Sequence, residues 1–197
     1  MTIVIEENLD WNGSLELRHK TELIVLHHAA TSKCTVQDIH QWHLNRGWTG
    51  IGYHYFVRKD GSVYRGRPRD TVGAHAYNYD FNSIGICAEG NYEVEQMPEA
   101  QLKAIITLVA ELEKIYPDAK VVGHRELNAT VCPGANFPME QIKAGKIGIE
   151  KVTVKVKGKE IEGYIINGHT HVPVRDIIDA LTYEVKWDGE TRTVIVE

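Results

Sequence analysis

The sequence has few cysteines, no long apolar run and no surplus of basic residues, and each lack excludes a class of protein. Three cysteines among 197 residues cannot build a disulfide framework, so we expect free thiols or metal ligands. No stretch approaches the roughly 20 apolar residues of a membrane span. A net charge of -5 and a pI near 6.1 argue against a nucleic-acid partner. The start lacks the basic and apolar segments of a secretory signal, so we expect no export by that route.

What remains is the composition of an ordinary globular protein, with 43% hydrophobic and 25% charged residues. The length allows one good core, or a medium domain followed by a small one. We expect the second arrangement, because the character of the sequence changes near residue 150 from alternating strands and helices to short strands and turns.

The segment from Gly123 to Gly134 carries an imidazole, His124, and a thiol, Cys132, in a turn-rich loop. These groups suit a borderline-soft divalent metal such as zinc far better than calcium or magnesium. A histidine and a cysteine alone also arise by chance as a loop residue and a core residue. A metal site therefore requires a third ligand and a pocket from elsewhere in the chain.

Residues 21–28 form a continuous apolar run that ends in two histidines, which predicts a buried strand with polar groups at its carboxyl end. Binding sites lie at this end of the strands in such sheets. Successive side chains point to opposite faces, so a site on one face can use either His27 or His28 but not both. The alternative for each is a hydrogen-bonded structural histidine.

The next two predicted elements are a helix and a hairpin. The helix spans residues 35–46, with Thr35 as its N-cap, and its predicted core-facing residues are Val36, Ile39, Trp42 and His43. The hairpin joins residues 51–57 to residues 62–65 through a Lys-Asp-Gly turn. Alternation along its first strand predicts one face with Tyr53, Tyr55 and Val57 and another with His54 and Phe56.

The sequence pattern in the central part of the chain predicts a loop, a strand, a long helix and a short strand. The loop, residues 72–82, mixes aromatic, amide and imidazole groups that suit a polar sugar or peptide, although it reads equally as a solvated loop. A buried strand follows and closes with Glu89, either a general base or a structural partner. A helix over residues 98–116, with an apolar stripe that includes Ile115, precedes a strand that delivers His124. These elements predict an α/β fold with a mixed sheet flanked by helices.

Residues 20–144 resemble the zinc-dependent N-acetylmuramoyl-L-alanine amidases of the type 2 family, which includes amidase-type phage lysozymes and peptidoglycan recognition proteins. The resemblance rests on six short segments in the family's order and spacing: Val25-Leu26-His27-His28-Ala29-Ala30-Thr31, Gly52-Tyr53-His54-Tyr55, Gly73-Ala74-His75-Ala76, Asn82-Ser83-Ile84-Gly85-Ile86, Gly123-His124-Arg125-Glu126 and Cys132-Pro133-Gly134.

The resemblance implies a role for each matching residue. It selects His27 over His28 as the third ligand of one catalytic zinc, beside His124 and Cys132, with the fourth position left for water. It places Tyr53 beside the metal, and His75 and Asn82 in the groove that binds the glycopeptide. We expect Tyr53 and Thr130 to be catalytic residues that flank the zinc-bound water and the substrate carbonyl. Thr130 stands where the family has Lys or Thr. Glu89, the third candidate catalytic residue, matches a carboxylate that only some branches use.

Residues 151–197 resemble the small β-rich module found at the N-terminus of copper amine oxidases and on many bacterial cell-wall proteins. The pattern predicts hairpins with turns at Asn167-Gly168 and Asp188-Gly189, and a helix over residues 174–181. About 47 residues are marginal for independent folding, so we expect this accessory module to dock on the amidase domain, residues 1–146, or to form a homodimer. A role in binding the cell wall is also expected.

The resemblance implies a peptidoglycan hydrolase that cleaves the amide between N-acetylmuramic acid and L-alanine of the stem peptide, with zinc-activated water. Made without a signal peptide, it would act on the wall after release, as a phage endolysin or an autolysin. One alternative is a non-catalytic peptidoglycan-binding protein on the same fold. Another is a structural zinc site closed by His28 or His75 as a fourth ligand.

Overall fold

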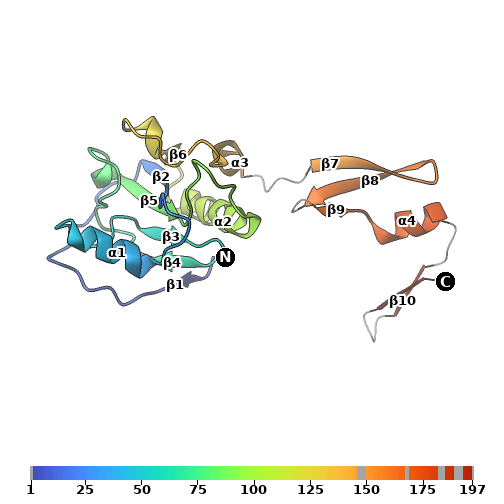
Figure 1. Cartoon of the computed structure of the whole chain (residues 1–197), viewed down its shortest axis with the longest axis horizontal. Helices are drawn as coiled ribbons and strands as arrows, with labels where there is room; N and C mark the ends of the chain where they lie inside the picture. Colours follow the sequence, from blue (N-terminus) through green and yellow to red (C-terminus); the bar gives the residue numbers. More distant parts are fainter. Residues whose placement is uncertain (1, 146–149, 167–168, 182–184, 189–192, 197) are drawn as a thin grey trace. The chain divides into compact units, whose positions relative to one another are not determined.

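The computed structural model of the chain describes residues 2–145, 150–166, 169–181, 185–188 and 193–196. The chain divides into two compact units, Met1–Ile147 and Gly148–Glu197 (Figure 1). All the residues that the sequence predicts for the site belong to the first unit.

The first unit is built on a mixed six-stranded sheet in the order β1-β4-β3-β5-β2-β6. Its strands are β1 (Val4–Ile5), β2 (Leu23–His28), β3 (Tyr55–Val57), β4 (Val63–Arg65), β5 (Ser83–Ala88) and β6 (Lys120–Gly123). Only β3 and β4, which flank the predicted hairpin turn, pair antiparallel; the other neighbours are parallel. The predicted mixed sheet is confirmed.

Helices cover both faces of this sheet (Figure 1). They are α1 (Val36–Asn45), α2 (Glu99–Ile115) and α3 (Met139–Lys143), with short 3-10 turns η1 (Asp80–Asn82) and η2 (His124–Glu126). As predicted, Thr35 caps α1, in a capping box with Asp38. The larger core joins α2 and α3 to one face, and the smaller joins α1 to the other around Phe56 and Cys87.

Two predicted core positions are wrong. Trp42 of α1 is 41% exposed, and His40 is buried instead, with ring nitrogens that meet the carbonyl of Asp10 and the backbone N–H of Ile51. The segment after β1 and the loop before β3 thus supply polar partners for the imidazole of His40. Ile115 is 49% exposed because it is the last residue of α2.

The predicted face of Tyr53 is also wrong. Tyr55 and Val57 belong to the larger core, whereas Tyr53 packs with Phe56 in the smaller core. The reason is that β3 begins only at Tyr55, so the alternation of a strand does not extend back to Tyr53. This places the Tyr53 ring on the face of the sheet that α1 covers.

The second unit contains a three-stranded antiparallel sheet, a helix and a two-stranded ribbon. The elements are β7 (Glu150–Val156), β8 (Lys159–Ile166), β9 (His169–His171), α4 (Val174–Leu181), β10 (Val185–Asp188) and β11 (Thr193–Val196). The predicted helix has the observed bounds, and β10 and β11 pair antiparallel. The predicted turns at Asn167-Gly168 and at Gly189 fall outside the described residues.

Candidate metal centre

Parallel pairing brings the first two candidate ligands together. Strands β2 and β6 are neighbours, and their register sets Leu26 opposite Gly123. The next residues, His27 and His124, therefore leave adjacent strands at the same edge of the sheet, and their ring centroids are 4.6 Å apart. His28 points to the other face, where its Nδ1 accepts the backbone N–H of Tyr92 at 3.1 Å. Of the two histidines, His27 therefore shares the face of the sheet with His124, whereas His28 does not.

The loop after η2 carries the third candidate ligand back to this edge. The N–H of Arg125 donates to the carbonyl of Cys132 at 2.8 Å, and the guanidinium of Arg125 donates to the carbonyl of Gly134 at 3.0 Å. Gly134 has φ +108°, and a Cβ there would lie 2.4 Å from the Tyr92 backbone, so only glycine allows this close approach. The loop is therefore held by two hydrogen bonds from Arg125 and by its close approach to Tyr92, which set the position of the thiol.

One nitrogen of His27, one nitrogen of His124 and the sulfur of Cys132 all lie within 4.8 Å of one another. The Cys132 Sγ to His27 Nδ1 distance is 3.7 Å. Two imidazoles and a thiol form a donor set that fits zinc or a similar divalent metal. Among the described residues no fourth His, Cys or carboxylate atom joins this group, which is the open arrangement of a catalytic rather than a structural site.

The remaining ring nitrogens of both histidines have partners. His27 Nε2 lies 3.0 Å from Nδ1 of His75, and His124 Nε2 lies 3.0 Å from Oδ1 of Asn128. Partners of this kind orient a metal-binding imidazole and set which nitrogen carries the proton. The sequence reasoning missed Asn128. Its signal is its position four residues after His124, at the end of the same tight turn.

Burial makes the two imidazoles neutral. It lowers the pKa of His27 well below the usual 6.5, with further lowering from His75 and His124, and it also lowers the pKa of His124. Neutral rings keep the lone pair that a metal needs. Burial raises the pKa of the Cys132 thiol to about 11, against the opposing effects of the His28 backbone and Arg125. A thiolate at this position is therefore favoured by a bound cation.

A cavity of about 480 Å³ lies beside the candidate metal site, with His124 as the one candidate ligand in its lining. Its lining consists of His43, Arg46, Trp48, Tyr53, Ala74, His75, Ala76, Tyr77, Asp80, His124, Asn128, Ala129 and Thr130. His27 is almost fully buried and packs against Tyr53 and His75, with ring centroids 5.0 Å away in both cases. The aromatic and polar lining suits a ligand that combines sugar and peptide groups.

Two of the predicted catalytic residues border this cavity. Burial raises the pKa of Tyr53 well above 10, so its phenol stays protonated and can donate a hydrogen bond. The Thr130 hydroxyl oxygen accepts the N–H of Cys132 at 3.2 Å, which leaves its own hydrogen free to donate. The cavity therefore has two neutral hydroxyl donors near the candidate metal position.

Glu89 and Asn82 do not line the cavity. The buried Glu89 carboxylate accepts the backbone N–H groups of Cys34 at 3.2 Å and Lys59 at 3.0 Å, and it pairs with Arg58 at 3.4 Å. Asn82 donates to the Glu22 carboxylate at 2.7 Å, at the amino end of β2. His27 lies near the opposite end of that strand, so Asn82 is distant from the candidate ligands. Glu89 follows β5 at the same end of the sheet as His28, but its carboxylate is engaged with Cys34, Arg58 and Lys59.

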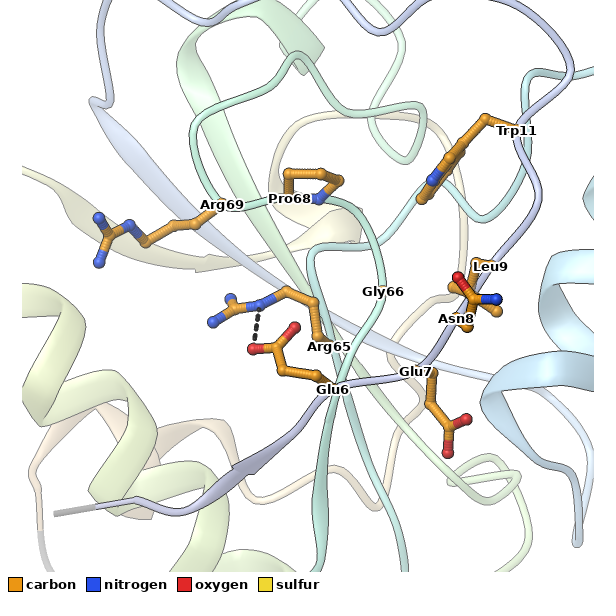
Figure 2. A pocket seen from close by; sticks show the side chains of 9 residues that line it. All are labelled: Glu6, Glu7, Asn8, Leu9, Trp11, Arg65, Gly66, Pro68 and Arg69. Carbon is orange, nitrogen blue, oxygen red and sulfur yellow. Dashed lines mark hydrogen bonds and ion pairs between the residues drawn. The ribbon is translucent and has the colours of Figure 1, made fainter.

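A second cavity, of about 460 Å³, lies between the N-terminal segment and the residues that follow β4 (Figure 2). Figure 2 shows the ion pair of Glu6 and Arg65, with an Oε1 to Nε distance of 3.3 Å, and the ring of Trp11 at its edge. None of the residues that the sequence predicts for the site lines it. Its balanced charges do not indicate one class of ligand.

Comparisons with known proteins agree on one family. The family model for N-acetylmuramoyl-L-alanine amidase matches residues 17–135, and that for the copper amine oxidase N-terminal domain matches residues 149–197. The endolysin of Enterobacteria phage K11 is 33% identical over 66% of this chain and 91% of its own length. Peptidoglycan-recognition protein SC2 of Drosophila melanogaster is 32% identical over 68% and 83%.

Among solved structures, the amidase LysC from Clostridium intestinale matches with a TM-score of 0.71 and 39% identity, covering 73% of this chain and 97% of LysC. The Ph2119 endolysin from a Thermus scotoductus bacteriophage matches with a TM-score of 0.65 and 30% identity, over 73% of this chain and 98% of its own.

The matched relatives and structures are cell-wall amidases and peptidoglycan-recognition proteins, and the chain has a candidate metal site beside a polar cavity. The chain belongs to the N-acetylmuramoyl-L-alanine amidase family and carries a C-terminal domain of the copper amine oxidase N-terminal type. It is a peptidoglycan hydrolase of the amidase class. No helix among the described residues has the length and apolar character needed to cross a membrane.

Proposed function

We propose that the chain cleaves the amide bond between the lactyl group of N-acetylmuramic acid and L-alanine, with one zinc ion held by His27, His124 and Cys132. The observation that carries this proposal is the group of three ligand atoms within 4.8 Å of one another beside a polar cavity. When bound, zinc polarises a carbonyl and lowers the pKa of water to about 7.

Two hydroxyl groups assist the reaction in this proposal. The Tyr53 phenol, kept protonated by burial, donates a hydrogen bond to the carbonyl oxygen as negative charge develops on it. The Thr130 hydroxyl donates from the opposite loop and brings no charge, so its contribution is smaller. His75 contributes less to direct substrate binding than the family resemblance implies, because both of its ring nitrogens already have protein partners. Asn82 also contributes less, because its side-chain nitrogen is bound to Glu22 and the residue does not line the cavity.

The role of Glu89 distinguishes two mechanisms of proton transfer, one with this carboxylate as the general base and one without it. Its three partners within the fold support a structural role in the strand-end region, in which case the general base is not this carboxylate. Glu89→Gln should then lower stability while turnover per folded molecule stays near the parent value. A collapse of turnover in a folded, zinc-loaded variant would instead identify Glu89 as the base.

The test of the proposed function is digestion of purified cell wall with and without a chelator. We expect new L-alanine amino termini and free lactyl carboxyl groups on muramic acid, and their loss on chelation. Elemental analysis should find one zinc per chain in the parent and almost none in Cys132→Ala. Near-stoichiometric zinc in that variant would remove the thiol from the site.

Variants at the two hydroxyls test their roles. Tyr53→Phe should keep zinc while turnover falls on the order of 100-fold, and Thr130→Ala should fall less. Tyr116→Phe, at the C-terminal end of α2, is the matched control and should behave as the parent. Full activity of Tyr53→Phe on soluble muropeptides would contradict the role of Tyr53.

We also propose where the enzyme acts and what its second unit does. The relatives that are phage endolysins favour action on peptidoglycan after release by lysis. The module at residues 151–197 would support binding to the wall, or would form a homodimer, and would leave the chemistry to the first unit.

A further inference from the structure

The two ring nitrogens of His27 face different groups. Nδ1 lies 3.7 Å from Sγ of Cys132, on the side of the candidate metal, whereas Nε2 lies 3.0 Å from Nδ1 of His75. A neutral imidazole carries its proton on one nitrogen only. His27 can offer Nδ1 to a metal only if its proton sits on Nε2, so the tautomer of His27 decides whether the site is ready to bind.

A chain of hydrogen bonds behind His27 fixes this tautomer. The Ser83 hydroxyl donates to the carbonyl of Tyr79 at 2.7 Å, which uses its only hydrogen. Nε2 of His75 lies 3.3 Å from the Ser83 Oγ. Because the Ser83 hydroxyl has no second hydrogen, Nε2 of His75 must be the donor in this contact. Nδ1 of His75 is consequently unprotonated and accepts a hydrogen bond from Nε2–H of His27. The His27 proton is thereby held on the side away from Cys132.

The His75 ring is also fixed in space. A Cβ at Gly73 would lie 2.5 Å from its Cδ2, and a Cβ at Gly85 would lie 2.6 Å from the same atom, so the ring occupies a slot that two glycines leave open. Its backbone N–H donates to Asp80 Oδ1 at 2.6 Å. His75 as a whole is 8% exposed. With both nitrogens engaged and the ring enclosed, little of His75 remains for a substrate.

We propose that His75 is a positioning residue, which with Ser83 holds His27 in the Nε2–H tautomer and in the orientation that presents Nδ1 to the metal. The proposal rests on the proposed function only in taking His27 as a metal ligand. It changes the expected role of His75 from contact with the glycopeptide to support of the metal centre. An imidazole, rather than a carboxylate or a carbonyl, then serves as the acceptor behind the ligand.

Zinc affinity of the full chain, measured by competition with a chromophoric chelator, tests the proposal. His75→Ala should weaken zinc binding by about 10- to 100-fold, the usual effect of losing a partner behind a ligand. His75→Asn places an amide oxygen near the position of Nδ1 and should restore most of the affinity. Ser83→Ala should weaken binding less, because only the second link is lost. An affinity of His75→Ala equal to the parent value would overturn the proposal.

The matched control is His40→Ala, which removes another buried histidine of the same unit that bonds the backbone of Asp10 and Ile51. His40→Ala should lower the stability of the fold but leave the zinc affinity unchanged. If His40→Ala weakens zinc as much as His75→Ala does, general loosening of the fold explains both and the proposal is wrong.

Nitrogen-15 spectra of the zinc-loaded full chain give a second readout that does not depend on activity. We expect the His27 proton on Nε2, slow to exchange in the parent and faster in His75→Ala, with zinc on Nδ1. A proton on Nδ1 and zinc on Nε2 would overturn the inference even if His75→Ala fails to fold. A parent that binds no zinc would instead refute the proposed function, so the two failures are distinguishable.

Discussion

The strongest test of the electrostatics around the cavity is the replacement of His43 by asparagine. His43 lies on α1, is 5% exposed, and accepts the backbone N–H of Gly52 at Nδ1, 2.9 Å away. Burial lowers the pKa of His43 to about 4, with help from the nearby Arg46 and Arg67. Protonation of Nδ1 would replace the acceptor of this hydrogen bond by an N–H group that faces the N–H of Gly52. The asparagine side chain can offer an oxygen near the position of Nδ1 and does not titrate in this range.

The magnitude follows from the two pKa values. The unfolded histidine binds a proton below about pH 6.5, whereas the folded one does so only below about pH 4. Above pH 6.5 both forms are neutral and the difference contributes nothing. As the pH falls from 6.5 to 4, the unfolded state gains protons first, so the free energy of unfolding decreases. Because one pKa unit is worth about 1.36 kcal/mol, the loss at His43 amounts to about 3 kcal/mol.

The assay is urea unfolding of the parent and His43→Asn between pH 7 and pH 4, with chelator present so that metal release is the same in both. Other buried histidines contribute equally to both proteins, so the difference between the two pH profiles isolates His43. We expect a loss of stability that is smaller in His43→Asn by about 3 kcal/mol at pH 4, or about 6 to 12 °C in Tm. Identical profiles would refute the reasoning. His19→Asn, at an exposed position, is the control.

Three further predictions concern the fold and the second unit. Gly52→Ala places a Cβ 1.9 Å from the carbonyl oxygen of Ala74. This clash should lower the free energy of unfolding by about 3 kcal/mol or more, which thermal unfolding can measure. Gln101→Leu leaves the Tyr92 hydroxyl and two buried carbonyls without its amide and should cost about 2 to 4 kcal/mol. Deletion of residues 151–197 should preserve turnover on soluble muropeptides but weaken action on whole sacculi.

Each of these has an outcome that would contradict it. Gly145→Ala, where a Cβ meets no atom, should lose only the strain of its positive φ, about 1 kcal/mol, and an equal loss at Gly52 would argue against the clash. Gln41→Leu on the exposed side of α1 should be near neutral. Equal loss of the deletion variant on both substrates would show that the second unit supports the catalytic fold.

Most elements of the amidase unit, though not β1 or α3, followed from local patterns in the sequence. Apolar runs and periodicities predicted β2, α1, the β3–β4 hairpin, β5, α2 and β6 because each pattern is set by which face of a strand or helix is buried. The prediction that an imidazole and a thiol would suit zinc also needed only the residue types. The family resemblance added the choice of His27, which the alternation within β2 agrees with.

Only the tertiary structure decided which polar side chains meet the ligands. Asn82 and Glu89 resemble site residues by their motifs, yet hydrogen bonds to partners 60 and 55 residues distant in the chain hold them elsewhere. His75 meets His27 across 48 residues, in a slot between two glycines that no local pattern signals. Such contacts depend on strand order and on loops packed from several segments. The periodicity of a sequence indicates only whether a side chain is buried. Which side chain it contacts depends on how the strands and loops pack in the folded sheet.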